Sequence, residues 1–100
     1  MAVEIRFAPE FGQDLAESYA WYEEQRRGLG EEFLARVDDC LDGILDHPEM
    51  YAEFHGTFRR GLLRRFPYAL FYEYGEKVVT VHGLFHHSRD PEKWRRRLVG

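Results

Sequence analysis

The sequence contains a single cysteine, Cys40, and no apolar run near the roughly 20 residues that a membrane-spanning helix needs. One cysteine excludes a disulfide bond within the chain and a zinc site built on cysteines. The first residues, Met1 to Glu4, lack the basic and apolar regions of a signal peptide. We therefore expect a cytoplasmic protein that does not enter a membrane.

The chain also lacks internal repeats, low-complexity tracts and any sign of a domain boundary. Its 100 residues suffice for one domain that buries roughly two-thirds of the unfolded surface. Apolar residues make up 44% of the chain and aromatic residues 16%, which argues against disorder by composition. We therefore predict a single domain over residues 1–100.

Acidic residues are concentrated in the first half of the chain and basic residues in the second. Residues 1–55 contain 4 Lys or Arg and 14 Asp or Glu, a balance of −10, whereas residues 56–100 contain 10 and 4, a balance of +6. This division indicates either a directed contact with an anionic partner or pairing of the two halves with each other. The total of −4 argues against strong, indiscriminate nucleic-acid binding, and we expect no sequence-specific DNA binding by this chain alone.

The first half predicts a strand followed by two helices. Alternating apolar and charged residues predict a half-buried strand at residues 3–7. Apolar residues at helical spacing predict an amphipathic helix at residues 10–27, and residues 28–30 predict its stop. A second helix closes at His47-Pro48, so the two helices form an antiparallel hairpin. The buried stripe predicted for the first helix consists of Phe11, Leu15, Tyr19 and Tyr22, with Trp21 outside it.

The second half predicts three strands, and its most distinctive stretch is residues 59–74. Phe66-Pro67 interrupts that stretch, because proline has no N–H to donate within a sheet. Period-two alternation on both sides predicts two strands joined at residues 65–67, and a last strand follows at about residues 77–85. The two faces predicted for the first of these strands are Phe58, Arg60, Leu62 and Arg64 against Arg59, Gly61 and Leu63.

The element order strand–helix–helix–strand–strand–strand predicts an α+β fold, with the helical hairpin packed on one face of a small antiparallel sheet. Met50, Tyr51 and Phe54 are expected to close one end of the core. The other face of the sheet and its margins would carry most of the arginines and histidines. We therefore expect a binding surface there.

The arginines of the second half are the main candidates for partner binding. Guanidinium groups recognise carboxylate and phosphate groups through paired hydrogen bonds. The same side chains could instead lie on a solvated face or form ion pairs with the acidic helices, and the pattern leaves both interpretations open. Trp94 is expected to dock the C-terminal segment on the sheet, and residues 95–97 to form a solvated basic end. The candidate partner-binding residues are Arg59, Arg60, Arg64, Arg65, Arg89 and Trp94.

His86 and His87 are the candidates for proton transfer or metal binding. Adjacent residues on a strand point to opposite faces, so the pair cannot ligate one metal ion with ordinary geometry. One of the two could exchange protons near neutral pH. Alternatively, one packs against the core and the other is solvated. We expect no metal and no cofactor.

Several short segments, spread over nearly the whole chain, carry a resemblance to a known family. They are Asp14-Leu15, Trp21-Tyr22-Glu23-Glu24-Gln25, residues 28–33, His47-Pro48-Glu49-Met50-Tyr51, Arg59-Arg60, residues 65–72 and residues 85–91. Together they resemble the RelE/ParE toxin superfamily, especially its ParE-like branch of plasmid-stabilisation proteins. The most specific elements are Arg-Phe-Pro-Tyr and Arg-Asp-Pro, in this order and separation. The resemblance implies a helical hairpin on an antiparallel sheet, in agreement with the pattern of the residues.

This resemblance implies the toxin of a type II toxin–antitoxin pair, neutralised by a cognate antitoxin whose C-terminal segment wraps the toxin. ParE-like members inhibit DNA gyrase by binding it, whereas RelE-like members cleave mRNA on the ribosome, commonly with a C-terminal tyrosine. Near the place of that tyrosine stands Trp94, which has no ionisable proton. Because the net charge is also acidic, we favour a non-catalytic inhibitor of gyrase over an endoribonuclease.

Two alternatives to the gyrase inhibitor stay open. If the protein is a ribosome-dependent mRNA endoribonuclease, the candidate catalytic residues are Arg65, His87 and Arg89. The other alternative is a non-toxic binding relative that has no cellular target.

Overall fold

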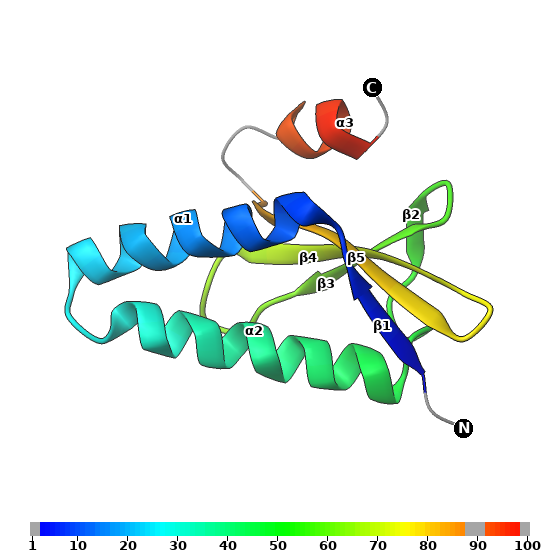
Figure 1. Ribbon diagram of the computed structural model, residues 1–100, viewed down its shortest axis with the longest axis horizontal. Coiled ribbons are helices and arrows are strands. Elements are labelled where there is room, and N and C mark those ends of the chain that lie inside the picture. Colours follow the sequence, from blue (N-terminus) through cyan, green and yellow to red (C-terminus); the bar gives the residue numbers. More distant parts are fainter. Residues whose placement is uncertain (1–2, 88–91, 99–100) are drawn as a thin grey trace.

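The computed structural model describes residues 3–87 and 92–98. Two helices lie side by side on one face of a sheet, and a short third helix lies beyond them (Figure 1). The elements in chain order are β1 (Glu4–Phe7), α1 (Pro9–Gln25), α2 (Leu29–Asp46), β2 (Glu53–His55), β3 (Phe58–Leu62), β4 (Tyr68–Gly75), β5 (Val78–His86) and α3 (Glu92–Leu98). The α+β class and the predicted order of the main elements are confirmed, with β2 and α3 as additions to that order.

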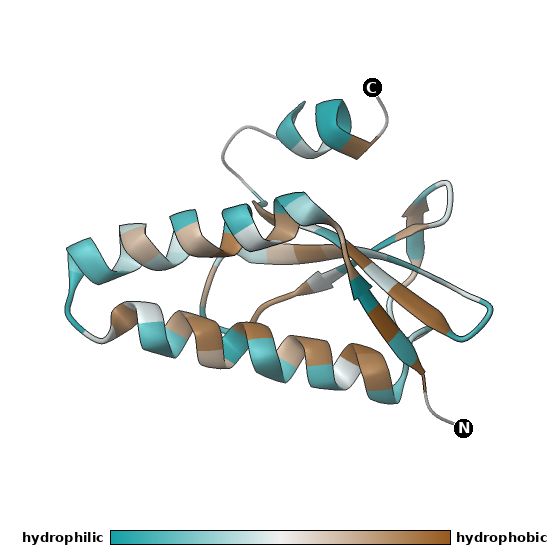
Figure 2. Cartoon of the chain, in the orientation of Figure 1, coloured by the Kyte–Doolittle hydropathy of each residue, from teal (hydrophilic) through white to brown (hydrophobic). Residues whose placement is uncertain are grey.

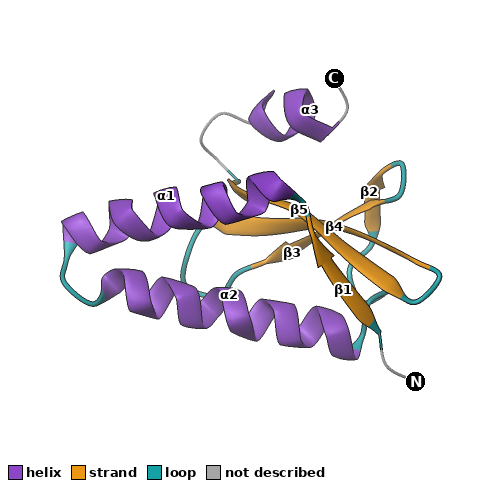
Figure 3. Cartoon of the chain, in the orientation of Figure 1, coloured by secondary structure: helices purple, strands orange, loops and turns teal. Residues whose placement is uncertain are grey.

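The five strands form one sheet in the order β1-β5-β4-β3-β2 (Figure 3). Antiparallel pairing holds from β2 to β5, but β1 runs parallel to β5. The sheet is therefore mixed rather than purely antiparallel. The chain reaches β5 from β1 through the helical hairpin and the other strands, and such a long connection is what parallel pairing requires.

The turn between the two helices depends on glycine. Gly28 has a φ of 89°, in the left-handed region that glycine adopts without steric cost. Gly30 is not part of a linker, because α2 already begins at Leu29. Its buried N–H donates a hydrogen bond of 2.8 Å to the Glu23 carboxylate, so a side chain of α1 satisfies one of the free N–H groups in the first turn of α2.

Hydrophobic side chains pack on both faces of the sheet, and the brown inner sides of α1 and α2 in Figure 2 mark the larger layer. That layer includes Phe33, Val37 and Ile44 from α2 together with Leu70 and Tyr72 from β4. The smaller cluster on the opposite face consists of Ala69, Phe71 and Phe85, with Phe54, Trp94 and Leu98 packed against it. The predicted alternation of β4 is thereby confirmed, since even-numbered positions face the helical hairpin and odd-numbered positions face α3.

The predicted buried stripe of α1 is confirmed for Phe11 and Tyr22, which are buried, and for Leu15, which packs against the core. The buried face also contains Asp14 and Ser18, which the spacing did not predict. Asp14 can be buried because the Leu84 N–H and the Arg97 guanidinium donate hydrogen bonds to its carboxylate.

Of the three residues expected to close one end of the core, Tyr51 and Phe54 pack against the hydrophobic clusters. The prediction was wrong for Met50, which has an exposed fraction of 55%.

Within the described parts of the chain, no helix combines the length and the apolar character needed to cross a membrane.

Candidate partner-binding surface

The loop between β3 and β4 carries two exposed arginines, Arg64 and Arg65. Neither guanidinium group makes an ion pair or hydrogen bond with another described residue. Arg65 has a φ of 71°, an uncommon conformation for a residue with a side chain. Both arginines are therefore available to a partner.

Backbone hydrogen bonds hold this loop in place. The Leu63 N–H donates to the Tyr68 carbonyl at 2.9 Å, and the Tyr68 N–H donates to the Phe66 carbonyl at 2.8 Å. A third bond of 3.0 Å runs from the His87 N–H to the Pro67 carbonyl, so the end of β5 is joined to the loop. The two arginines thus project from a fixed base.

Phe66 anchors the loop in the core. Its ring packs edge-on against Tyr22, with 4.9 Å between ring centroids, and against Phe33 at 5.2 Å. The phenyl ring thus points inward, whereas the two preceding arginines are exposed. The Arg-Phe-Pro-Tyr motif is therefore partly structural, with Arg65 its solvent-facing member.

Arg60 and Leu62 extend the exposed region along β3. The Arg60 guanidinium lies 4.8 Å from the centroid of the Phe54 ring, a cation–π contact on the α3 side of the sheet. Leu62 has an exposed fraction of 55% and was not among the predicted contact residues. We call Arg60, Leu62, Arg64 and Arg65 the cationic surface.

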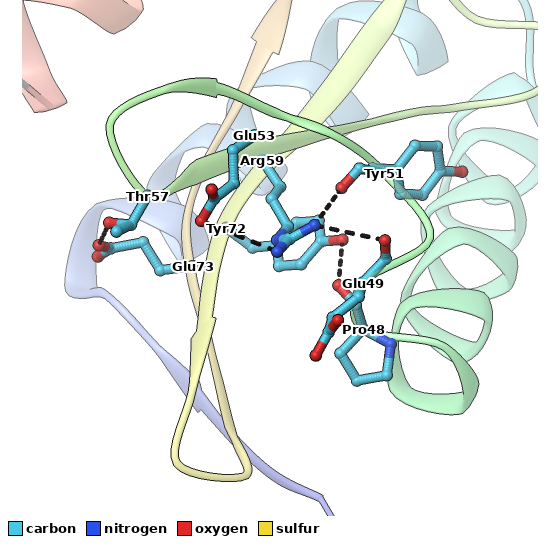
Figure 4. A network of polar contacts seen from close by, with 8 residues as sticks. All are labelled: Pro48, Glu49, Tyr51, Glu53, Thr57, Arg59, Tyr72 and Glu73. Atoms are coloured by element: carbon cyan, nitrogen blue, oxygen red, sulfur yellow. Dashed lines mark hydrogen bonds and ion pairs between the residues drawn. The ribbon is translucent and has the colours of Figure 1, made fainter.

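Arg59 is used inside the protein, although it was a candidate for partner binding. Its guanidinium donates to the Tyr51 carbonyl at 2.6 Å and to the Glu49 carbonyl at 3.3 Å, and it lies 3.8 Å from the Glu53 carboxylate (Figure 4). The side chain keeps only 15% exposure. Arg59 therefore fixes the connector between α2 and β2 and is not part of the cationic surface.

Tyr72 belongs to the same polar network. Its hydroxyl donates a hydrogen bond of 2.8 Å to the Pro48 carbonyl (Figure 4). Burial raises the pKa of Tyr72 to about 12, because the phenolate would lose its hydration. Tyr72 and Arg59 together hold the connector against the sheet.

The other predicted site residues differ in their exposure and in the contacts that they make. His87 is exposed beside the loop, and its ring lies 6.0 Å from that of His86, which packs edge-on against Tyr68. Trp94 is half-buried and packs against Phe54 at 5.1 Å between ring centroids, so its predicted docking on the sheet is confirmed. Arg89 lies outside the described residues.

Arg97 was expected in a solvated end, and that expectation was wrong. Its guanidinium binds both carboxylate oxygens of Asp14, at 2.6 and 2.8 Å, and lies 4.7 Å from the centroid of the Phe85 ring. The Asp14 carboxylate also accepts a 3.0 Å hydrogen bond from the Leu84 N–H. One buried acid therefore connects α1, β5 and α3.

An open groove of about 310 Å³ lies beside this ion pair. Its walls come from α1, from the ends of β4 and β5, and from Lys93 of α3. Trp21, predicted to lie outside the buried stripe, is 44% exposed at this groove. In the described parts of the chain, no three His, Cys, Asp or Glu side chains are grouped so that they could hold a metal ion.

These features define a small α+β domain, with a helical hairpin on one face of a mixed sheet and an exposed cationic surface. The family model described as the ParE toxin of the type II toxin–antitoxin system, parDE, matches residues 5–91. The chain therefore belongs to the ParE toxin family.

A solved structure described as the chromosomal ParDE TA system from P. aeruginosa contains a similar fold. The TM-score is 0.75 at 10% sequence identity, and the match covers 85% of this chain and 96% of that chain. At this identity the likeness shows the fold alone. No curated protein matches this sequence.

Proposed function

We propose that this protein is neutralised by a cognate antitoxin and inhibits cell growth by binding DNA gyrase, without catalysis. Membership of the ParE toxin family supports the toxin part of this proposal. The ParDE system of the structural relative supports an antitoxin partner. The gyrase target rests on the ParE-like branch that the sequence resembles.

The observation that carries the binding proposal is the pair of exposed arginines on a fixed loop. Arg64 and Arg65 have no internal partner among the described residues, whereas Arg59 does. An antitoxin segment with carboxylates could pair with both guanidinium groups without first breaking an internal contact. Leu62 beside them offers an apolar contact, and a hydrophobic centre with a polar rim is typical of protein interfaces.

The first experiment measures binding of the antitoxin encoded beside this protein. We expect Arg64→Ala combined with Arg65→Ala to weaken binding at least ~10-fold, because two charge-assisted contacts are lost. The matched control is Arg26→Ala combined with Arg27→Ala, which removes the same charge from the exposed turn between α1 and α2. Equal affinities of the two double variants would exclude the cationic surface as the antitoxin contact.

The gyrase target has its own cellular test. Expression without the antitoxin should arrest growth and relax a reporter plasmid, because inhibited gyrase no longer introduces negative supercoils. If growth continues normally, the protein is instead a non-toxic binding relative. Growth arrest with unchanged plasmid supercoiling would exclude gyrase as the target.

Ribosome-dependent RNA cleavage is the second candidate function, and one observation favours it. The hydrogen bond from the His87 N–H to Pro67 brings His87 beside the loop that carries Arg65. Against it, Trp94 is packed on Phe54 and Phe71, and its indole cannot act as an acid or base. Transcript cleavage by wild-type protein and its loss in His87→Ala would establish the enzyme in place of the gyrase inhibitor.

A further inference from the structure

The outer edge of β1 is an unused strand edge. In the described part of the chain β1 is the terminal strand of the sheet, and β5 is its only neighbour (Figure 1). The Glu4 N–H donates to the Lys77 carbonyl at 2.9 Å, and the Ala8 N–H donates to the Val81 carbonyl at 2.9 Å. In a parallel ladder alternate residues bond to the same neighbour. The backbone groups of Ile5 and Phe7 therefore point away from β5, toward the free edge.

The side chains along this edge follow a symmetric pattern. Val3 and Ile5 pack partly against the core on the helical side, and Phe7 stacks on Phe11 with 5.3 Å between ring centroids. Glu4 and Arg6 point to the opposite face, where they form an ion pair with each other and stay 56% and 67% exposed. On each side of Ile5 a charged residue comes first and an apolar residue second, and the two charges have opposite sign.

We propose that two copies of this protein pair through their β1 strands, in antiparallel orientation about a twofold axis at Ile5. Ile5 then faces Ile5 of the second copy, and Val3 faces Phe7. These are the residues with outward-pointing backbone groups, so they form the hydrogen-bonded pairs of the new ladder. The two sheets become one continuous sheet.

The charges fix this register. With Ile5 opposite its own copy, Glu4 of each chain faces Arg6 of the other, and residues at such non-hydrogen-bonded positions have the closest side chains. The two internal ion pairs, one in each copy, are replaced by two pairs across the interface. A one-residue shift would place Glu4 opposite Phe7 and would put side chains on the wrong face.

The geometry also limits assembly to a dimer. A twofold contact uses the same edge on both copies, so no free β1 edge remains for a third. Only Ala8 separates the end of β1 at Phe7 from the start of α1 at Pro9, which keeps the paired segment short. A short segment buries little surface, so the dimer is weak and forms at high protein concentration.

The test is sedimentation equilibrium from about 10 µM to about 1 mM, the range in which a small interface associates. Glu4→Arg alone and Arg6→Glu alone should each weaken dimerisation on the order of tenfold, because like charges then face each other twice. An equimolar mixture of these two variants should form heterodimers, since all four facing charges become complementary. The double variant with both changes should regain the wild-type dimer.

Asp38→Arg on the exposed side of α2 is the matched control for a changed charge, and it should leave the dimer unaltered. A wild-type protein that stays monomeric throughout the range overturns the proposal. A dimer that none of the β1 variants weakens also overturns it. The same holds if the single variants weaken the dimer but neither their mixture nor the double variant restores it. Neither the antitoxin nor gyrase enters the experiment, so its result is independent of the proposed function.

Discussion

Asp14 and Arg97, which are 83 positions apart in the sequence, form a two-point ion pair that holds α3 against α1 and β5. The Asp14 side chain keeps 5% exposure and the Arg97 side chain 24%. The contact raises the pKa of Arg97, chiefly through its hydrogen bonds to Asp14. Beside this ion pair, Trp94 and Leu98 of α3 pack against the smaller hydrophobic cluster on the sheet.

Arg97→Ala should lower the free energy of unfolding by about 2–3 kcal/mol. Removing one partner of a fully buried pair typically costs roughly 3–5 kcal/mol, and the partial exposure of Arg97 reduces that cost. Urea unfolding is the measurement. Arg95→Ala is the control: Arg95 pairs with Glu92 on the exposed side of α3, so we expect a change within about 0.5 kcal/mol. Equal effects of the two variants would show that the Asp14 contact does not hold α3.

Arg59→Ala should destabilise the fold by about 2 kcal/mol, whereas Arg64→Ala should leave stability within about 0.5 kcal/mol of wild type. The Arg59 guanidinium donates to the Tyr51 and Glu49 carbonyls, and its loss leaves those groups without that donor. Arg64 is exposed and makes no such contact. The measurement is again urea unfolding of each single variant. A stability loss confined to Arg64→Ala would reverse our assignment of structural and binding roles.

The raised pKa of Tyr72 predicts that the folded protein loses stability at alkaline pH. Its pKa is about 12 in the folded protein and 10.0 ordinarily, so the neutral phenol is favoured by folding. The stabilisation is complete below pH 10 and is lost as the pH rises through about 12. Tyr72→Phe removes this dependence and costs about 1 kcal/mol at neutral pH through the lost hydrogen bond to Pro48. The free-energy difference between wild type and variant should therefore shrink above pH 10 in urea unfolding; a constant difference would contradict the prediction.

Substitution by alanine at two helical glycines should change the stability of the protein in opposite directions. A Cβ at Gly30 would lie 2.7 Å from the Glu23 side chain and 2.8 Å from the Tyr19 ring, so Gly30→Ala should destabilise the protein by about 1 kcal/mol. At Gly12 a Cβ meets no atom within 4 Å, and Gly12→Ala should stabilise α1 by about 0.5–1 kcal/mol. Thermal unfolding of both variants gives the comparison. Stabilisation by both changes would show that α1 and α2 are not in close contact at Gly30.

Local patterns in the sequence predicted most elements because the causes of those elements are local. Pro9, Gly28 and Pro48 mark the ends of the helices, and period-two alternation identified both faces of β4. The parallel pairing of β1 with β5 was not predicted. It depends on contacts between segments more than 70 positions apart, and a pattern within one strand carries no information about the direction of its neighbour.

The candidate site was predicted less completely, for a similar reason. Arg59 and Arg60 are adjacent and identical in type, yet one lies in an internal network and the other on the surface. Strand alternation separates them, but only the position of the α2–β2 connector decides which face contains acceptor carbonyls. The burial of Asp14 likewise depends on Arg97, 83 positions away, and no pattern within α1 indicates that partner.

The central proposal is that this member of the ParE toxin family acts on gyrase. The most direct measurement is the supercoiling of relaxed plasmid by purified gyrase, with increasing amounts of this protein and then of its antitoxin. Our account predicts inhibition that rises with protein concentration and is relieved by the antitoxin. Full supercoiling at a large molar excess of folded protein would contradict it.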